Sequence, residues 1–330
     1  MKSYEGSTQK GLVSLEELFE GPVAELQGRD FLSLADYSRE ELEALLRLAQ
    51  ALKDMPRDSQ RRILKGKTLG MIFQKASTRT RVSFEVGIYQ LGGHGLFLSG
   101  QDLQLRRGET IGDTAQVLSR YLDGIMIRTF GHDEVEELAR FAAIPVINGL
   151  TDLLHPCQAL GDYFTLWELW GDLAGRRLVY VGDGNNMAHS LLLGGAILGV
   201  EVAVISPEGY LPQETIVQMA RELAERSGGN IEVTSDLAAV EGADVLYTDV
   251  WASMGQESEQ AKRVAAFRAY QVDGDLLRKA NKHAVVMHCL PAHRGEEISA
   301  EVMDGPQSVI FQQAENRLHI QKAIMAALMR

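Results

Sequence analysis

Apolar and polar positions along the chain alternate in a pattern that predicts strands and helices in turn. Short apolar runs bounded by polar residues or glycine predict buried strands, and longer segments with apolar residues at helical spacing predict the helices between them. The first series of predicted strands comprises 67–73, 94–98, 124–128 and 145–148. The second series comprises 177–181, 201–205, 230–233, 244–248 and 284–287.

A long helical pattern over 158–169 separates the two series, and another over 314–328 ends the chain. Strands that alternate with helices predict parallel sheets covered by helices on both faces. We therefore expect an α/β protein with two doubly wound parallel-sheet domains, a cleft between them and a long helix that joins them. Ligands of such sheets bind beyond the carboxyl ends of the strands.

Composition narrows the class of protein. The chain has 330 residues, enough for two domains, and its net charge of -12 argues against nucleic acid as a partner. No apolar run is long enough to span a membrane, no signal peptide is evident, and two cysteines do not indicate a disulfide framework. A cytoplasmic location is expected. Residues 1–28 are polar or acidic with several glycines, which suggests a partly ordered arm.

The segment 77–81, with the sequence STRTR, is the strongest single indication of chemistry. It lies between the predicted strand 67–73 and a helical pattern, so its side chains gather at a helix N-terminus. Backbone N–H groups, the hydroxyls of Ser77, Thr78 and Thr80, and the planar guanidinium of Arg79 all suit phosphate or carboxylate oxygens. An ordinary helix cap with solvated arginines is the alternative interpretation.

Further polar groups follow other predicted strands, where they would converge on one edge. They are Arg128, the HPCQ segment 155–158, GDGNN at 182–186, 249–255 and HCLP at 288–291. GDGNN fits dinucleotide binding poorly, because Met187 replaces the third glycine and Ser206, not an acid, follows the next strand. The amides of Asn185 and Asn186 suit an amino-acid head group instead. A Walker A motif is absent.

Several longer motifs then identify a family. They are FQKASTRTRVSFE, RRGETIGDTAQVLSRY, HPCQAL, GDGNNMAHS, TDVWASMGQE, HCLPAHRGEE and QAENRLHIQKA, in that order over about residues 30–330. The chain resembles the aspartate/ornithine transcarbamoylase superfamily, and TDVWASMGQE and HCLPAHRGEE resemble its ornithine branch. The resemblance implies transfer of a carbamoyl group from carbamoyl phosphate to the δ-amine of L-ornithine, giving L-citrulline and phosphate, in arginine biosynthesis or degradation. It implies no metal and no organic cofactor.

The resemblance also assigns residues to carbamoyl phosphate. Arg128 and His155 would hold the carbamoyl oxygen, and Gln158 with the backbone carbonyl of Leu290 would bind the carbamoyl NH₂. The phosphate would be bound by four residues of the STRTR segment: Ser77, Thr78, Arg79 and Thr80. Arg317 would reach back from the last helix, and Gln104 matches a position that contacts carbamoyl phosphate in a neighbouring subunit.

Ornithine would be held by a second group. Its α-carboxylate and α-amino group would contact Asn186, Asp249, Ser253 and the backbone of Met254. Cys289 would lie beside the δ-amine as the candidate proton acceptor, and a thiol near several arginines would ionise readily. A packing and orienting role for Cys289 is the alternative.

At the level of domains, the resemblance implies a carbamoyl-phosphate-binding domain over 29–155 and an ornithine-binding domain over 156–312. The C-terminal helix, 313–330, would return to the first domain. The family forms trimers, sometimes assembled further, with sites completed across subunits.

Three other functions remain to be weighed. The first is a transcarbamoylase with a different amine acceptor, such as putrescine or an acylated ornithine. Asp249, Ser253 and Met254 disfavour putrescine as the acceptor, since putrescine lacks both α groups. An aspartate transcarbamoylase would need cationic groups for a second carboxylate, which TDVWASMGQE does not offer. A catalytically silent relative is the third, although every motif residue is present. The direction of the reaction, assembly beyond a trimer and the role of residues 1–28 do not follow from the motifs.

Overall fold

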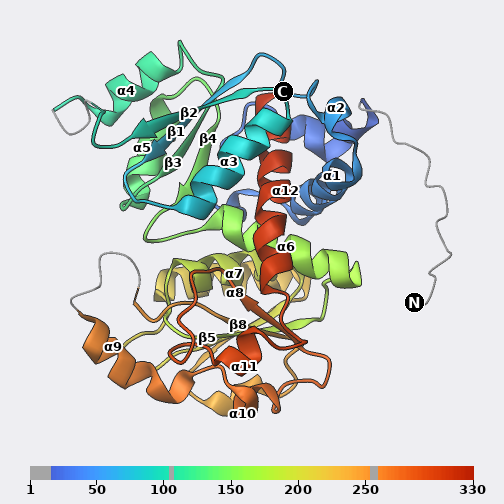
Figure 1. Cartoon of the computed structure of the whole chain (residues 1–330), viewed down its shortest axis with the longest axis vertical. Coiled ribbons are helices and arrows are strands. Elements are labelled where there is room, and N and C mark those ends of the chain that lie inside the picture. The colour runs from blue at the N-terminus through green and yellow to red at the C-terminus, as the bar shows by residue number, and fades with distance from the viewer. Residues whose placement is uncertain (1–15, 104–107, 253–258) are drawn as a thin grey trace.

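The computed structural model describes residues 16–103, 108–252 and 259–330. The chain forms two lobes, each built around a parallel β-sheet, and Figure 1 shows them one above the other with α12 running between them. This is the predicted α/β architecture.

The first sheet has the strand order β2-β1-β3-β4, and all its neighbours are parallel. Its strands are β1 (Thr68–Phe73), β2 (His94–Ser99), β3 (Gly124–Arg128) and β4 (Val146–Leu150). The helices of this part are α1 (Arg39–Asp54), α2 (Arg57–Gln60), α3 (Thr78–Gln90), α4 (Ile111–Leu118) and α5 (His132–Phe141). Every strand lies within two residues of its predicted bounds.

The second sheet has the order β7-β6-β5-β8-β9 and is again fully parallel. Its strands are β5 (Arg177–Val181), β6 (Glu201–Ile205), β7 (Asn230–Thr234), β8 (Val245–Thr248) and β9 (Val285–His288). Its helices are α7 (Asn186–Leu198), α8 (Glu214–Ser227), α9 (Gln260–Phe267), α10 (Gly274–Leu277) and α11 (Ala300–Met303). Short 3₁₀ turns lie at Glu17–Phe19, Gly21–Leu26, Leu34–Asp36, Leu237–Val240 and Arg268–Tyr270.

Alternate residues of a strand pack on opposite faces of its sheet, as the two-residue period of a strand requires. In β1, Met71 belongs to the core that includes α3, whereas Ile72 packs with α4 and α5. In β5, Tyr180 joins the core that includes α7, and Val179 packs on the opposite face. The inner strands of both sheets are therefore buried on both sides, which explains why they are almost continuously apolar, whereas the edge strands β2 and β7 are partly exposed.

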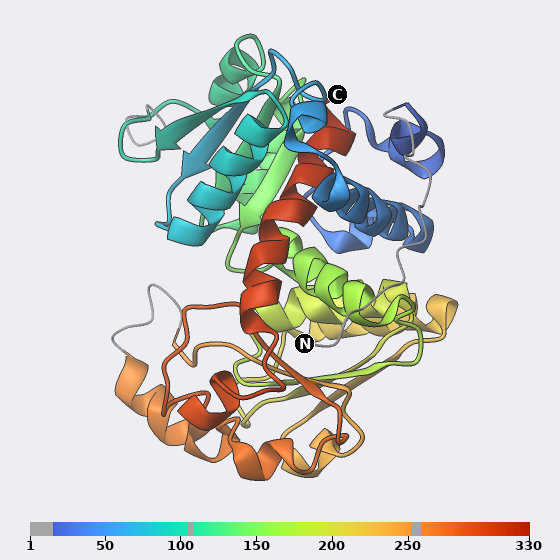
Figure 2. The same cartoon turned by 45° about the vertical axis from the view of Figure 1, so that its right-hand side comes forward.

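Two helices connect the lobes. α6 (Pro156–Trp170) follows β4 and precedes β5, and α12 (Ile310–Met329) packs against α6, α1 and α3. Figure 2 shows α12 extending from the second lobe along the first, so the end of the chain lies with the first lobe. Because α6 and α12 contact both lobes, some of their side chains lie between the two lobes.

Part of the expected N-terminal arm belongs to the core. Phe19, Val23 and Leu26 are buried, and the backbone N–H of Gly28 donates a hydrogen bond to the carbonyl of Leu328 at 2.9 Å. The sequence did not predict that these three apolar residues are buried, because the composition of residues 1–28 is mostly polar. Among the described residues, no helix is both long enough and apolar enough to cross a membrane.

Candidate active site

Ser77 begins the part of the site that holds the STRTR residues. Its extended backbone ends the loop after β1, and its hydroxyl accepts a hydrogen bond from the backbone N–H of Thr80 at 3.2 Å, so α3 begins at Thr78. The STRTR segment therefore lies at a helix N-terminus, as the sequence pattern predicts. The segment from Lys75 to Thr80 lines a cavity of about 1340 Å³ between the carboxyl ends of the two sheets. The start of α3 therefore lies at the wall of this cavity.

Three arginines converge on this cavity from three elements. Arg79 lies in the first turn of α3, Arg128 ends β3, and Arg317 projects from α12. The Nη2 atom of Arg317 donates a hydrogen bond to Thr80 Oγ1 at 2.9 Å. Of the carboxylates that the structure describes, none lies within ion-pairing distance of these guanidiniums.

Burial and neighbouring positive charge lower the pKa of two of these arginines, Arg128 and Arg317. Burial, together with the charges of Arg317 and Arg79, lowers the pKa of Arg128 to about 9, and burial also lowers the pKa of Arg317. The Nε atoms of both buried side chains have no hydrogen-bond partner in the described part of the chain. Uncompensated buried positive charge of this kind is suited to an anionic ligand.

His155 and Gln158 lie beside the arginines at the start of α6. The backbone N–H of His155 donates to Ser190 Oγ at 2.7 Å, which fixes the helix start against α7. Burial, followed by the charges of Arg317 and Arg128, lowers the pKa of His155 well below its usual range, so the imidazole is neutral at physiological pH. His155 Nδ1 and Gln158 Oε1 are buried without partners in the described structure.

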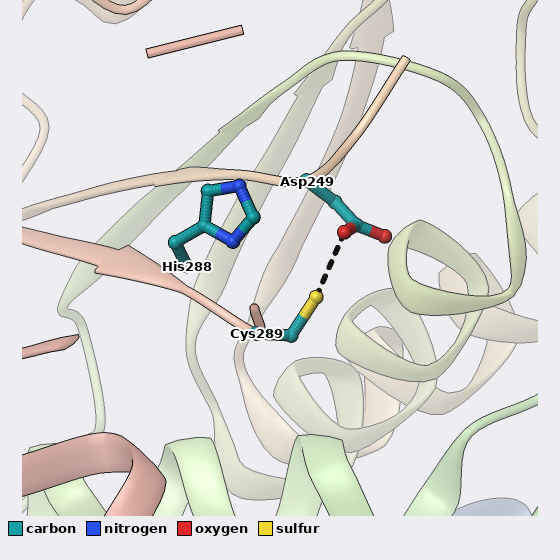
Figure 3. Close-up of side chains that lie close together, drawn as sticks. All are labelled: Asp249, His288 and Cys289. Atoms are coloured by element: carbon teal, nitrogen blue, oxygen red, sulfur yellow. Dashed lines mark hydrogen bonds between the residues drawn. The ribbon is translucent and has the colours of Figure 1, made fainter. Parts of the chain in front are cut away.

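Asp249 and Cys289 face this group from the second lobe, at the ends of β8 and β9. Figure 3 shows the thiol pointing at the carboxylate, and Cys289 Sγ lies 2.9 Å from Asp249 Oδ1. Burial, reinforced by the charge of Asp249, raises the pKa of the Cys289 thiol well above its usual range. The expectation that this thiol ionises readily near the arginines is therefore wrong: the neighbouring carboxylate and the dry surroundings outweigh them.

The two asparagines of GDGNN have different partners. Asn185 caps α7, its Oδ1 accepting from the backbone N–H of Met187 at 2.9 Å, and its Nδ2 donates to Asp249 Oδ2 at 3.1 Å. Asn186, the predicted ornithine contact, donates through Nδ2 to the carbonyl of Thr151 at 2.6 Å. Both line the cavity. The sequence pointed to the pair, but only the fold shows that Asn185 orients Asp249.

Two clusters in the described part of the chain each offer three ligand atoms to a metal: Asp249, His288 and Cys289, and the less buried His293, Glu296 and Glu297. Groups of Asp249, His288 and Cys289 lie within 4.8 Å of one another. However, His288 Nε2 lies 3.0 Å from Glu297 Oε1, and its Nδ1 accepts the backbone N–H of Leu290 at 2.8 Å. The thiol is protonated and bonded to Asp249. The first donor set is thus engaged in hydrogen bonds and fits a metal poorly.

Two ion pairs at the cavity were not anticipated. Lys75, whose side chain is buried, pairs with Asp152 and lies over the ring of Phe130 at 4.4 Å. Arg263 Nη1 contacts Asp183 Oδ2 at 2.8 Å. Lys75 lies within FQKASTRTRVSFE and Asp183 within GDGNN, which was the available indication in the sequence. The predicted residues Gln104, Ser253 and Met254 lie outside the described residues.

The structure brings most of the predicted residues together. Twelve side chains or backbone segments from both lobes line this one cavity: Ser77, Thr78, Arg79, Thr80, Arg128, His155, Gln158, Asn186, Asp249, Cys289, Leu290 and Arg317. One wall is cationic, and the opposite wall holds a carboxylate and a thiol. The arrangement suits an anion and an amine-bearing molecule bound side by side.

Comparison with protein families finds two matching domains. The carbamoyl-P binding domain of aspartate/ornithine carbamoyltransferase matches residues 29–168, and the Asp/Orn binding domain of the same family matches residues 174–328. The chain belongs to the aspartate/ornithine carbamoyltransferase family. Several of its members are more than half identical to this chain in sequence.

Among these carbamoyltransferases, the ornithine carbamoyltransferase of Oceanobacillus iheyensis is 62% identical over 307 residues, covering 92% of this chain and 95% of the relative. That of Thermococcus kodakarensis is 58% identical, covering 93% and 98%. The solved ornithine carbamoyltransferase of Pyrococcus furiosus is 56% identical, with a TM-score of 0.89 over 92% of this chain and 98% of the other.

Proposed function

We propose that this carbamoyltransferase moves the carbamoyl group of carbamoyl phosphate to the δ-amine of L-ornithine, giving L-citrulline and phosphate. The observation that supports this most strongly is one cavity in which three arginines without carboxylate partners, in the described structure, face Asp249 and Cys289. The names of the similar ornithine carbamoyltransferases support the same substrates.

Carbamoyl phosphate would bind at the cationic wall. The start of α3, with Ser77, Thr78, Arg79 and Thr80, would hold the phosphate, whose negative charge increases as it leaves. Arg128 and the neutral imidazole of His155 would donate to the carbamoyl oxygen. Neutral His155 suits this role, because it can donate a hydrogen bond without adding a fourth repelling charge.

The phosphate and carbamoyl groups would be aligned further by Arg317, which Thr80 orients through the 2.9 Å hydrogen bond. Gln158 Oε1 and the carbonyl of Leu290 would accept hydrogen bonds from the carbamoyl NH₂. Leu290 adopts a left-handed backbone conformation, with φ 60, next to Cys289. For a leucine this conformation is uncommon, which suggests that the position of its carbonyl matters.

Ornithine would bind against the second lobe. Asp249 suits its α-ammonium, and Asn186, Ser253 and the backbone of Met254 would complete the contacts to the amino-acid head. The δ-ammonium must first lose a proton, after which the lone pair of the amine forms the C–N bond while the C–O bond to phosphate breaks, and the second proton that this nitrogen sheds leaves with the phosphate. A protonated thiol is not itself a base, so we assign the first proton to the linked Cys289–Asp249 pair.

This assignment divides the molecule as the sequence suggested. Residues 29–155 and 313–330 would bind carbamoyl phosphate, and residues 156–312 would bind ornithine. We also propose a cytoplasmic location. The Pyrococcus furiosus relative named "Ornithine carbamoyltransferase, anabolic" is 56% identical over 309 residues, which supports the biosynthetic direction.

Exposed apolar residues of the first lobe support a trimer. An α3–β2 patch contains Val82, Val86, Tyr89, Leu96 and Phe97, and an α4–α5 patch contains Val117, Tyr121 and Phe141. Since β2 is an edge strand, the first patch continues onto an open sheet edge. Two different patches suit a head-to-tail contact that closes a ring, rather than a contact of like with like.

Shared sites in such a ring make a specific prediction. Gln104, from one subunit, would contact carbamoyl phosphate bound by Arg79 of its neighbour. Mixing Gln104→Ala chains with Arg79→Ala chains should therefore restore part of the activity, because some sites in hybrid trimers contain both native residues. If no mixture recovers activity above that of either variant alone, the sites are not shared.

Thermal unfolding tests the proposed substrate class. Carbamoyl phosphate or inorganic phosphate should raise the melting temperature through binding to the cationic wall, and NADH should not. A rise with NADH alone would favour a dehydrogenase and contradict the proposal.

A further inference from the structure

Asp162 is a fully buried carboxylate in the middle of α6, without any cation bonded to it in the described structure. Its Oδ1 accepts hydrogen bonds from the side-chain amides of Gln158 and Gln313, each at 2.8 Å. Its Oδ2 accepts the hydroxyl of Tyr247 at 2.9 Å. These donors come from α6, α12 and β8, so one carboxylate connects both lobes.

An ionised carboxylate can only accept hydrogen bonds, so the amide NH₂ groups of both glutamines must face it. The reverse orientation would place an amide oxygen against a carboxylate oxygen at hydrogen-bonding distance, with no proton between them. Burial raises the pKa of Asp162 to about 6, and the three donors oppose this rise, so the group remains ionised at pH 7 and above. The chemistry of Asp162 therefore decides the direction of both amides.

For Gln158, the consequence is an acceptor aimed at the cavity. Gln158 lines the cavity, and its Oε1 is buried with no hydrogen-bond partner among the described residues. Leaving a buried acceptor without a hydrogen-bond donor is unfavourable, and a ligand N–H would relieve that cost. A ligand with a methyl group in place of that N–H would leave Gln158 Oε1 without a hydrogen-bond donor.

For Gln313, the consequence is a fixed end of β9. Its Oε1 accepts the backbone N–H of His288 at 2.9 Å, which holds the strand directly before Cys289 and Leu290. Asp162 thus acts on the Gln158 oxygen directly and on the Leu290 carbonyl through Gln313. In the proposed function, on which this inference rests, these two oxygens are the acceptors for the carbamoyl NH₂.

We propose that Asp162 is a positioning residue that makes the site select a carbamoyl group over an acetyl group. It does so by aiming two acceptors at the substrate nitrogen. Acetyl phosphate is the appropriate competitor, because it has the same phosphate and carbonyl but a methyl group in place of NH₂. Discrimination by an unsatisfied polar group exceeds what a pocket achieves by shape alone.

The test compares three ligands in three proteins. Dissociation constants for carbamoyl phosphate, acetyl phosphate and inorganic phosphate are measured for wild type, Asp162→Asn and Thr165→Val. The asparagine is isosteric but presents one NH₂ group, so it can no longer accept at both positions. Thr165→Val is the matched control, because it removes a buried hydroxyl one turn along α6 that bonds Gly161 and Asn316 but neither glutamine.

We expect Asp162→Asn to weaken carbamoyl phosphate binding at least tenfold and to leave inorganic phosphate within twofold of wild type. The preference for carbamoyl over acetyl phosphate should fall accordingly, and Thr165→Val should keep it. Equal weakening of all three ligands, or an unchanged preference, would overturn the positioning role. Should Asp162→Asn not fold, Gln313→Leu is expected to reduce the same preference, and an unchanged preference there would overturn it instead.

Failure of this inference and failure of the proposed function are separable. A wild-type protein that forms no citrulline contradicts the proposed function. A wild-type protein that forms citrulline, beside an Asp162→Asn variant with unaltered selectivity, contradicts only the role of Asp162.

Discussion

Replacing Arg128 by methionine should stabilise the ligand-free protein while it strongly lowers turnover. The guanidinium is buried, and within the described residues it forms no ion pair and its Nε has no hydrogen-bond partner. Its burial and the neighbouring Arg317 and Arg79 lower its pKa to about 9 from 12.5. At about 1.36 kcal/mol per pKa unit, the charged form is disfavoured by roughly 5 kcal/mol, an upper limit.

Methionine has a similar length and no charge, so it fills much of the same space. Part of the relieved repulsion is offset by altered packing, and a net gain of about 2 kcal/mol is a reasonable expectation. For a chain of this size, that gain corresponds to a melting temperature higher by roughly 4 °C. Loss of a donor to the carbamoyl oxygen should lower turnover on the order of a hundredfold or more.

Thermal unfolding with and without saturating inorganic phosphate, together with citrulline formation, measures both effects. Arg128→Met should melt above wild type without ligand and gain less from phosphate than wild type does. Arg47→Met is the matched control, because it removes an exposed arginine from α1 and should change neither quantity. An Arg128→Met protein that melts below wild type without ligand, or that retains normal turnover, would refute this reasoning.

Three further predictions concern other parts of the site. Arg79→Ala should lose about a hundredfold or more in turnover, because the leaving phosphate loses a cationic partner, and near-normal turnover would contradict its assignment. Asp249→Asn should raise the KM for ornithine at least tenfold while the dissociation constant of carbamoyl phosphate stays within twofold; the opposite pattern would move Asp249 to the other subsite. Asp162 has a folded-state pKa of about 6, raised from 3.8, so the folded protein takes up a proton before the unfolded chain does as the pH falls. Wild type should therefore gain stability relative to Asp162→Asn between pH 8 and pH 5, and a pH-independent difference in melting temperature would show that Asp162 does not titrate in this range.

The strands and the helix start at 77–81 could be predicted because their causes are local. The near-continuous apolar residues of 67–73 and 177–181 require a sheet buried on both faces, and β1 and β5 occupy those positions. The helix predicted from residue 158 begins earlier, at Pro156, where proline is well suited to the first helical position.

Features that depend on distant partners could not be predicted in the same way. The protonation of Cys289 is governed by Asp249, forty residues earlier, and by burial that only the assembled fold provides. The amide of Asn186 is engaged by the carbonyl of Thr151, which no motif indicates. Asp162 stands inside an apolar helical pattern, and its effect on Gln158 requires Gln313 from the other end of the chain.

The most direct test measures the carbamoylated product formed from carbamoyl phosphate and each of four amines side by side: L-ornithine, putrescine, N-acetylornithine and L-aspartate. The account predicts a strong preference for L-ornithine, with one phosphate released for each carbamoyl group transferred. Preference for another amine would contradict the roles of Asp249 and its neighbours, although the carbamoyl phosphate half of the site would stand. Turnover with none of them, in a folded protein that still binds carbamoyl phosphate, would contradict the central claim and indicate a catalytically silent relative.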